Sequence, residues 1–152
     1  MYKKVPTDLN FVDREAETLK FWKDNKIFER SLEMHKGDRK YTFYDGPPTA
    51  NGKPHIGHVL TRVIKDMIPR YHAMKGCDVP RKAGWDTHGL PVELEVEKLL
   101  GINGKEQIEE YGIAPFIEKC KESVWKYKSM WESFSDTVGF WADMKEPYVT
   151  YH

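Results

Sequence analysis

The chain has 152 residues, which suffice for one domain with a hydrophobic core and exclude an assembly of several domains. Its 24 lysines and arginines equal its 24 aspartates and glutamates in number, so no overall positive field attracts nucleic acid. No apolar run reaches transmembrane length, and residues 1–4 do not begin a signal peptide, so we expect a cytoplasmic protein without membrane contact.

The amino-terminal region predicts one helix, from Asn10 to about Ile27. Asn10 is a favourable N-cap, and Asp13 lies in the first turn, where a negative charge is stabilising. Residues 31–40 follow as a polar connector. We therefore assign residues 1–40 to an N-terminal helical extension.

A strand and a long helix come next, joined by a loop rich in glycine and proline. Residues 41–45 favour a strand, which stops abruptly at Gly46-Pro47-Pro48. The helix runs from Ile56 to about Lys75, and Pro69 within it predicts a kink. Its apolar residues recur at helical spacing: Ile56, Val59, Leu60, Val63, Ile64, Met67, Tyr71 and Met74.

The remaining chain predicts one strand and three helices. Residues 78–83 are weakly strand-like, and a strand–helix–strand unit requires a parallel strand there. Helices are expected at residues 91–100 and 105–111. A single long helix then carries an apolar stripe of Ile117, Cys120, Val124, Tyr127, Trp131, Phe134 and Val138, which we interpret as core. Residues 146–152 are expected to connect to further polypeptide.

The first turn of the helix that begins near Ile56 holds two histidines, His55 and His58, on nearly the same face. Exposed backbone N–H groups and the helix dipole favour an anion there, and imidazole donors suit a phosphate. The spacing alone also permits a metal site or an ordinary polar surface. Gly57 favours the phosphate, because a glycine costs helix propensity and offers a bare backbone to a flat ligand.

The segment Pro54-His55-Ile56-Gly57-His58 resembles the HIGH signature of class I aminoacyl-tRNA synthetases and related nucleotidylyltransferases. Residues 46–52 before it and residues 84–91 after it, which read Gly-Trp-Asp-Thr-His-Gly-Leu-Pro, resemble the isoleucine-specific members. The resemblance implies an α/β fold: the first half of a Rossmann-like (HUP-type) catalytic domain, with parallel strands and flanking helices, over residues 41–152. The chain would end before an inserted editing domain.

The resemblance also implies an activity. ATP with Mg²⁺ activates isoleucine, and the isoleucyl group then passes to tRNA(Ile), which is bound mainly by regions outside this chain. Zinc is possible in the parent enzyme, but neither Cys77 nor Cys120 lies in a C-x-x-C pair that would place it here. Because no K-M-S-K-S-type loop occurs, we expect the chain alone to bind ATP weakly and to turn over poorly.

Site residues follow from the matching motifs. His55 and His58 would stabilise the charge of the reacting phosphate, and the predicted ATP contacts are Thr49, Asn51, His55, Gly57 and His58. The predicted amino-acid contacts are Gly46, Pro47 and Asp86, with the Asp86 carboxylate facing the ammonium group. Trp85 and His88 would shape the pocket.

Two other functions compete with the synthetase. A non-catalytic nucleotide-binding module derived from a synthetase would retain the loops without the chemistry. A small HIGH-type nucleotidylyltransferase would not depend on isoleucine, and it leaves residues 84–91 without explanation.

Overall fold

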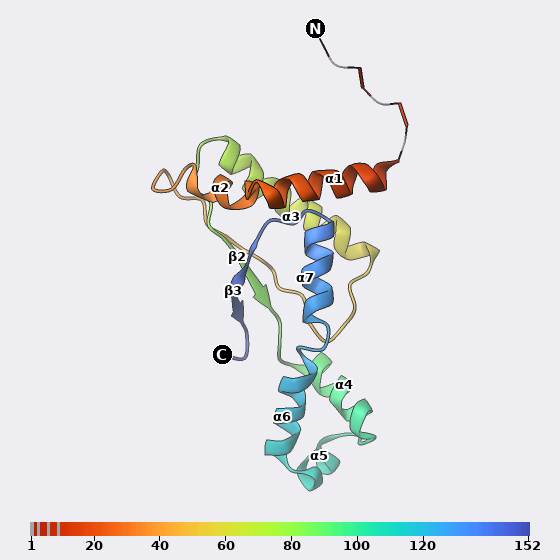
Figure 1. Ribbon diagram of the computed structural model, residues 1–152. Helices are drawn as coiled ribbons and strands as arrows, with labels where there is room; N and C mark the ends of the chain where they lie inside the picture. The colour runs from red at the N-terminus through yellow and green to blue at the C-terminus, as the bar shows by residue number, and fades with distance from the viewer. Residues whose placement is uncertain (1, 3, 6, 9) are drawn as a thin grey trace.

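The computed structural model describes residues 2, 4, 5, 7, 8 and 10–152. At its centre lies a three-stranded parallel sheet of β1 (Phe43–Tyr44), β2 (Arg81–Trp85) and β3 (Asp143–Val149), in the order β1-β2-β3 (Figure 1). Helices flank the sheet, so the predicted α/β class with parallel strands is confirmed. No helix of the described part is long and apolar enough to cross a membrane.

The amino-terminal helix is confirmed, although it ends earlier than predicted. Helix α1 (Phe11–Asp24) begins at Asn10, whose side chain accepts a hydrogen bond from the Asp13 N–H at 3.3 Å. The prediction of a connector from residue 31 was wrong at its start, because α2 (Ile27–Glu33) extends into it. A left-handed backbone at Lys26, with φ of 48°, separates the two helices.

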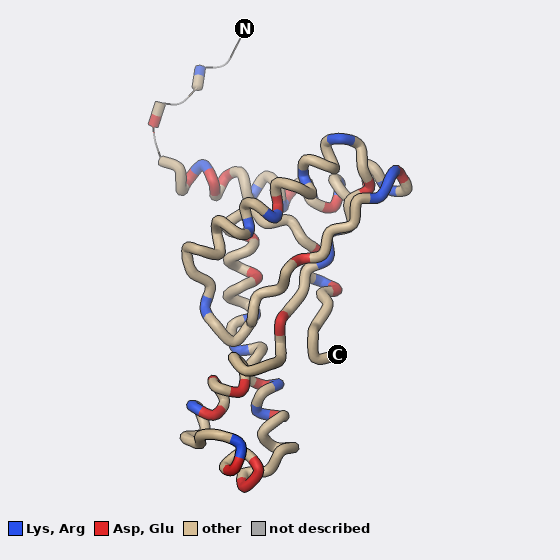
Figure 2. The backbone as a smooth tube through the Cα atoms, turned by 180° about the vertical axis from the view of Figure 1, so that it is seen from behind, with Lys and Arg blue, Asp and Glu red and all other residues tan. Residues whose placement is uncertain are grey.

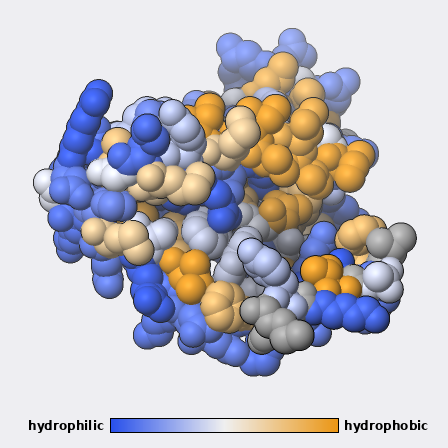
Figure 3. Space-filling view, turned by 90° about the horizontal axis from the view of Figure 1, so that it is seen from above, coloured by the Kyte–Doolittle hydropathy of each residue, from blue (hydrophilic) through white to orange (hydrophobic). Residues whose placement is uncertain are grey.

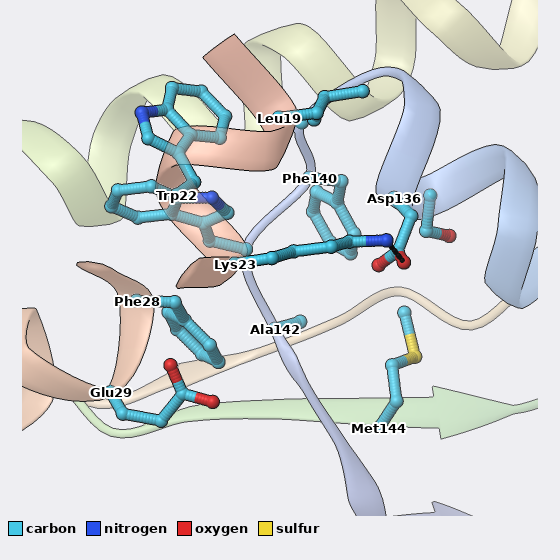
Figure 4. Close-up of a pocket in the computed structure, with 12 residues that line it drawn as sticks. Leu19, Trp22, Lys23, Phe28, Glu29, Asp136, Phe140, Ala142 and Met144 are labelled. Carbon is cyan, nitrogen blue, oxygen red and sulfur yellow. Dashed lines mark ion pairs between the residues drawn. The ribbon is translucent and has the colours of Figure 1, made fainter. Parts of the chain in front are cut away.

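These two helices pack against the segment that joins the last helix to β3. A cavity of about 280 Å³ remains between them, with Trp22 and Phe28 on one side and Phe140 on the other (Figure 4). Lys23 Nζ crosses it to reach Asp136 at 2.9 Å. The cavity contains none of the predicted site residues.

Helix α3 (Ile56–Met74) is confirmed, but its apolar stripe faces outward. The buried positions are Arg62 and Pro69, with Asp66 only 12% exposed, so the face toward the sheet is largely polar. The exposed apolar side chains form a broad patch, part of which is visible in Figure 3: Ile56, Leu60, Val63, Ile64, Met67, Ile68, Tyr71 and Met74.

The carboxyl-terminal half contains four helices before β3. Helices α4 (Leu90–Leu100) and α5 (Lys105–Tyr111) lie within about one residue of the predicted bounds. The prediction of a single last helix is wrong, because α6 (Ile113–Ser123) and α7 (Lys128–Thr137) are separate helices. The break lets α6 pack against α4 while α7 runs beside the sheet (Figure 1). Val124, at the break, is fully buried.

Basic and acidic residues are interspersed along helices α4, α5 and α6 (Figure 2). Lys119 and Lys121 of α6 pair with Glu122 and Glu118 at 2.7 and 2.9 Å. Each of these lysines therefore pairs with an acid of its own helix on a solvent-exposed face.

Strand β3 was not predicted; residues 146–152, which include its last four residues, were assigned to a connection. Its local sequence is unfavourable, because Pro147 removes a backbone donor and is tolerated only at an edge. Pairing with β2 creates the strand, with Lys82 opposite Asp143 and Trp85 opposite Val149. The register shifts between these pairs, where the Tyr148 ring covers Gly84.

Gly84→Ala is expected to destabilise the fold, because a Cβ there would lie 2.3 Å from the Tyr148 ring. Overpacking of this kind costs about 1–3 kcal/mol of unfolding free energy. Urea unfolding should show this loss, whereas Gly52→Ala, at a position with no heavy atom within 4 Å, should leave stability nearly unchanged. Equal stabilities of the two variants would contradict the packing of β3 on β2.

Candidate active site

A cavity of about 540 Å³ opens where the loop after β1 meets the start of α3. Loop residues 46–49, 52 and 53 form one wall, and His55, His58, Thr61, Arg62 and Lys65 form another. Trp131 of α7 closes the cavity and donates its indole N–H to the Gly52 carbonyl at 2.7 Å. The cavity lies beyond the carboxyl end of β1, the edge where ligands bind in open α/β sheets.

The two histidines cap α3 in a reciprocal arrangement. The His55 backbone N–H donates to Nδ1 of His58 at 3.0 Å, and the Gly57 N–H donates to Nδ1 of His55 at 3.1 Å. An Nδ1 that accepts a hydrogen bond carries no proton, so each neutral ring holds its proton on Nε2. Each imidazole therefore keeps its Nε2–H as a hydrogen-bond donor to a further group.

The surroundings of His58 favour this neutral form. Burial lowers the pKa of His58 below its ordinary value, and the nearby His55 and Arg62 lower it further. The edge of its ring meets Trp131, with ring centroids 4.7 Å apart. At neutral pH His58 is therefore a donor without a charge of its own.

Gly57 has a local role that the sequence did not indicate. A Cβ at this position would lie 3.0 Å from Cε1 and 3.1 Å from Nδ1 of His55. The His55 ring thus folds back over the glycine, and a side chain at this position would push the ring out of its place in the cap.

The cavity has a strong excess of positive charge. Lys53, Arg62 and Lys65 line it, and no aspartate or glutamate is among the described residues that do. Below the cavity lies Asp45, only 2% exposed, which pairs with Lys65 Nζ at 2.8 Å and with Arg62 Nη1 at 3.9 Å. Arg62 and Lys65 share this one carboxylate, so the three cations keep a net positive charge. The resulting field suits a polyanion.

Arg62 is an unusual part of this wall because it is only 3% exposed. Its guanidinium lies over the rings of Trp131, Phe134 and Phe140, the last at 4.5 Å. Its Nε and Nη1 are buried without hydrogen-bond partners among the described residues. Burial lowers the pKa of Arg62, and the Asp45 carboxylate opposes that shift.

The second predicted loop lies beside the first without lining the cavity. The Asp86 N–H donates to the Pro48 carbonyl at 3.0 Å, and Thr49 and Asp86 form a parallel bridge. The Asp86 side chain is 39% exposed. The two loops after β1 and β2 therefore form one continuous edge.

The predicted site residues divide into two groups. The structure brings Gly46, Pro47, Thr49, His55 and His58 to one cavity. The others lie outside its lining: Asn51, Gly57, Asp86, Trp85 and His88.

Asn51 and Trp85 of the second group contact other parts of the fold. The Asn51 amide donates to the Pro91 carbonyl at 3.1 Å. Trp85 is only 1% exposed and belongs to a core cluster with Ala50 and Trp131.

Sequence reasoning missed Arg62, Lys65 and the second role of Trp131. Arg62 and Lys65 follow His58 by four and seven residues, so all three share a helix face. That spacing was the available signal. Trp131 was assigned to the core, and it does pack there, but its edge also meets His58.

No group of three or more histidine, cysteine, aspartate or glutamate side chains in the described ranges could hold a metal ion. Cys77 and Cys120 are half-buried free thiols, and burial raises the pKa of Cys120.

Known proteins identify the class to which this fold and site belong. The family model "tRNA synthetases class I (I, L, M and V)" matches residues 17–152, and the chain belongs to this family. A solved structure of the agnB2 LeuRS-tRNA-LeuAMS ternary complex from Agrobacterium radiobacter K84 has a TM-score of 0.62. It is 22% identical and covers 94% of this chain and 16% of its own, so it supports the fold alone.

More similar relatives carry a particular name, isoleucine–tRNA ligase. The protein of Clostridium kluyveri is 65% identical over 151 residues, which are 99% of this chain and 15% of the relative. The protein of Clostridium novyi is 61% identical over 152 residues, or 100% of this chain and 15% of the relative. The chain therefore spans about 15% of the length of these relatives, and the resemblance noted in the sequence is confirmed.

The pKa of His58 gives a direct test of the site's electrostatics. We expect ¹⁵N NMR to show His58 titrating below the ordinary histidine pKa of 6.5. The unfolded chain binds this proton at higher pH than the folded chain does. The stability that His58 contributes is therefore complete above pH 6.5 and is lost as the pH falls from 6.5 through the lower pKa of the folded state. A His58 pKa above 6.5 would contradict the buried, cation-flanked geometry.

Proposed function

We propose that this chain supplies the nucleotide-binding half of an isoleucine–tRNA ligase active site. The observation that carries the proposal is the cavity at the start of α3, which combines Lys53, Arg62 and Lys65 with two imidazole donors and contains no acid among its described lining residues. A triphosphate is the ligand whose charge fits such a cavity. The names of the relatives indicate isoleucine and its tRNA as the other two substrates.

The reaction has two steps. The isoleucine carboxylate attacks the α-phosphate of ATP, so that pyrophosphate leaves and isoleucyl-adenylate remains. A terminal ribose hydroxyl of tRNA(Ile) then attacks the acyl carbon and releases AMP. The first step needs alignment and charge stabilisation more than a protein nucleophile.

The residues of the cavity suit the first step. His55 and His58 would donate from Nε2 to phosphate oxygens, where negative charge increases in the transition state. Because both rings already accept backbone hydrogen bonds at Nδ1, no proton transfer through them is required. Lys53 and Lys65 would face the departing pyrophosphate. Mg²⁺ would arrive with the nucleotide and be held mainly by its phosphates.

The amino acid would bind at the adjoining loop edge. Gly46 and Pro47 line the cavity and would face the isoleucine side chain, and Asp86 would pair with its ammonium group. Thr49 and Asn51 would add polar contacts near the nucleotide, and Gly57 would contribute by leaving room for the His55 ring. Trp85 would support the pocket from the core.

The exposed apolar patch of α3 is the physical reason to expect weak activity from the chain alone. Large side chains such as Leu60 and Met67 are 66% and 60% exposed, although burying each would contribute about 1.5–3 kcal/mol. Further polypeptide, such as the relatives possess, would cover this patch and complete the site.

Titration with a non-hydrolysable isoleucyl-adenylate analogue tests this proposal. His58→Ala and Asp86→Ala should each weaken binding by about tenfold or more, because each removes a hydrogen bond to a charged ligand group, typically about 1.5–3 kcal/mol. Thr18→Ala, which changes only an exposed hydroxyl on α1, serves as the control.

The outcomes separate the competing functions. If neither variant weakens analogue binding, the site assignment fails. If ATP binds at the cavity but the isoleucyl group adds no affinity, the chain is a general nucleotide-binding module or nucleotidylyltransferase instead.

A further inference from the structure

Thr150, the first residue after β3, contacts the loop that follows β2. Its Oγ1 lies 3.0 Å from the Thr87 N–H, 3.3 Å from Thr87 Oγ1 and 2.6 Å from His88 Nδ1. Its own backbone N–H donates to the Trp85 carbonyl at 3.2 Å. One residue thus bonds to the chain on both sides of Asp86.

The directions of these hydrogen bonds are consistent with one another. The Tyr151 N–H donates to Thr87 Oγ1 at 3.2 Å, which leaves the Thr87 hydroxyl proton free to donate to Thr150 Oγ1. The Thr150 hydroxyl proton then donates to Nδ1 of His88. Thr87 is only 4% exposed, whereas the His88 side chain is 63% exposed, so the arrangement runs from the interior to the surface. A side chain without a hydroxyl cannot replace Thr150 in it.

Asp86 depends on this support because its own carboxylate receives no hydrogen bond from the described residues. The Nδ1 atom of His88 lies 4.0 Å from Asp86 Oδ1, beyond hydrogen-bond distance. The Asp86 backbone is held on the other side by the Pro48 carbonyl. The segment from residue 86 to residue 88 is therefore clamped between the cavity loop and Thr150.

We propose that Thr150 is a positioning residue: its hydroxyl fixes the segment 86–88, so that the Asp86 carboxylate is held where the substrate's ammonium group binds. This inference rests on the proposed function, in which Asp86 pairs with that ammonium. It assigns amino-acid affinity, rather than nucleotide affinity, to a residue outside the HIGH-type loop.

The test compares two ligands on three variants of the full chain. Thr150→Val should weaken binding of the non-hydrolysable isoleucyl-adenylate analogue about tenfold, which corresponds to the roughly 1.4 kcal/mol that a hydrogen bond contributes, and should leave ATP affinity unchanged. Thr150→Ser retains the hydroxyl and should restore analogue binding. Thr137→Val removes an exposed hydroxyl that bonds only within α7, so it should alter neither affinity.

If Thr150 had only a structural role, Thr150→Val would weaken the binding of both ligands equally. That result overturns the inference, and so does unchanged binding of the analogue by Thr150→Val. If Asp86→Ala leaves analogue affinity intact, the proposed function fails instead. A second measurement needs no variant: ¹⁵N NMR of neutral His88 should show an unprotonated Nδ1. A protonated Nδ1 would contradict the arrangement.

Discussion

The buried carboxylate of Asp45 is the contact on which the site depends. Asp45 is the first residue after β1, and its carboxylate pairs with Lys65 and Arg62 of α3. Tyr148 of β3 donates its hydroxyl to the Asp45 carbonyl, and Lys65 also reaches the Gly46 carbonyl at 2.7 Å. The end of β1, the loop after it, helix α3 and strand β3 thus meet at one residue. Removing one partner of such a buried pair typically costs about 3–5 kcal/mol, because an uncompensated charge remains.

The same contact shapes the electrostatics of the cavity. Asp45 lies beneath the lining rather than in it, so it fixes Arg62 and Lys65 without presenting negative charge to a ligand. The aromatic rings under Arg62 replace part of the hydration that burial removes. His58 remains a neutral donor beside these cations. Positive charge and oriented N–H groups are therefore already in place in this cavity, as the proposed stabilisation of a reacting phosphate requires.

The sequence predicted those parts of the fold that local chemistry determines. The N-cap at Asn10, the start of α3 and helix α5 follow from capping residues and periodicity. Strand β3 and the break between α6 and α7 depend on distant partners. Pro147 and Glu146 argue against a strand until β2 provides the ladder, and Trp131 needs Gly52 to fix α7. The stripe of α3 identified a helix correctly, but it could not tell which face meets the sheet.

The candidate site also contains residues that local sequence predicts and residues that depend on distant contacts. The histidine pair was readable because a helix start determines where both rings lie. The importance of Arg62 could not be predicted, because an arginine within an amphipathic helix ordinarily faces water. Its burial depends on aromatic rings from α7 and from the segment after α7. Membership of the class I tRNA synthetase family places these features in context, and the chain holds about 15% of the length of its isoleucine–tRNA ligase relatives.

A crystal of this chain soaked with ATP and Mg²⁺ tests the central claim most directly. We expect the triphosphate in the cavity at the start of α3, with phosphate oxygens within hydrogen-bond distance of Nε2 of His58 and near Lys65. Nucleotide bound on another surface, with that cavity empty, would contradict the account.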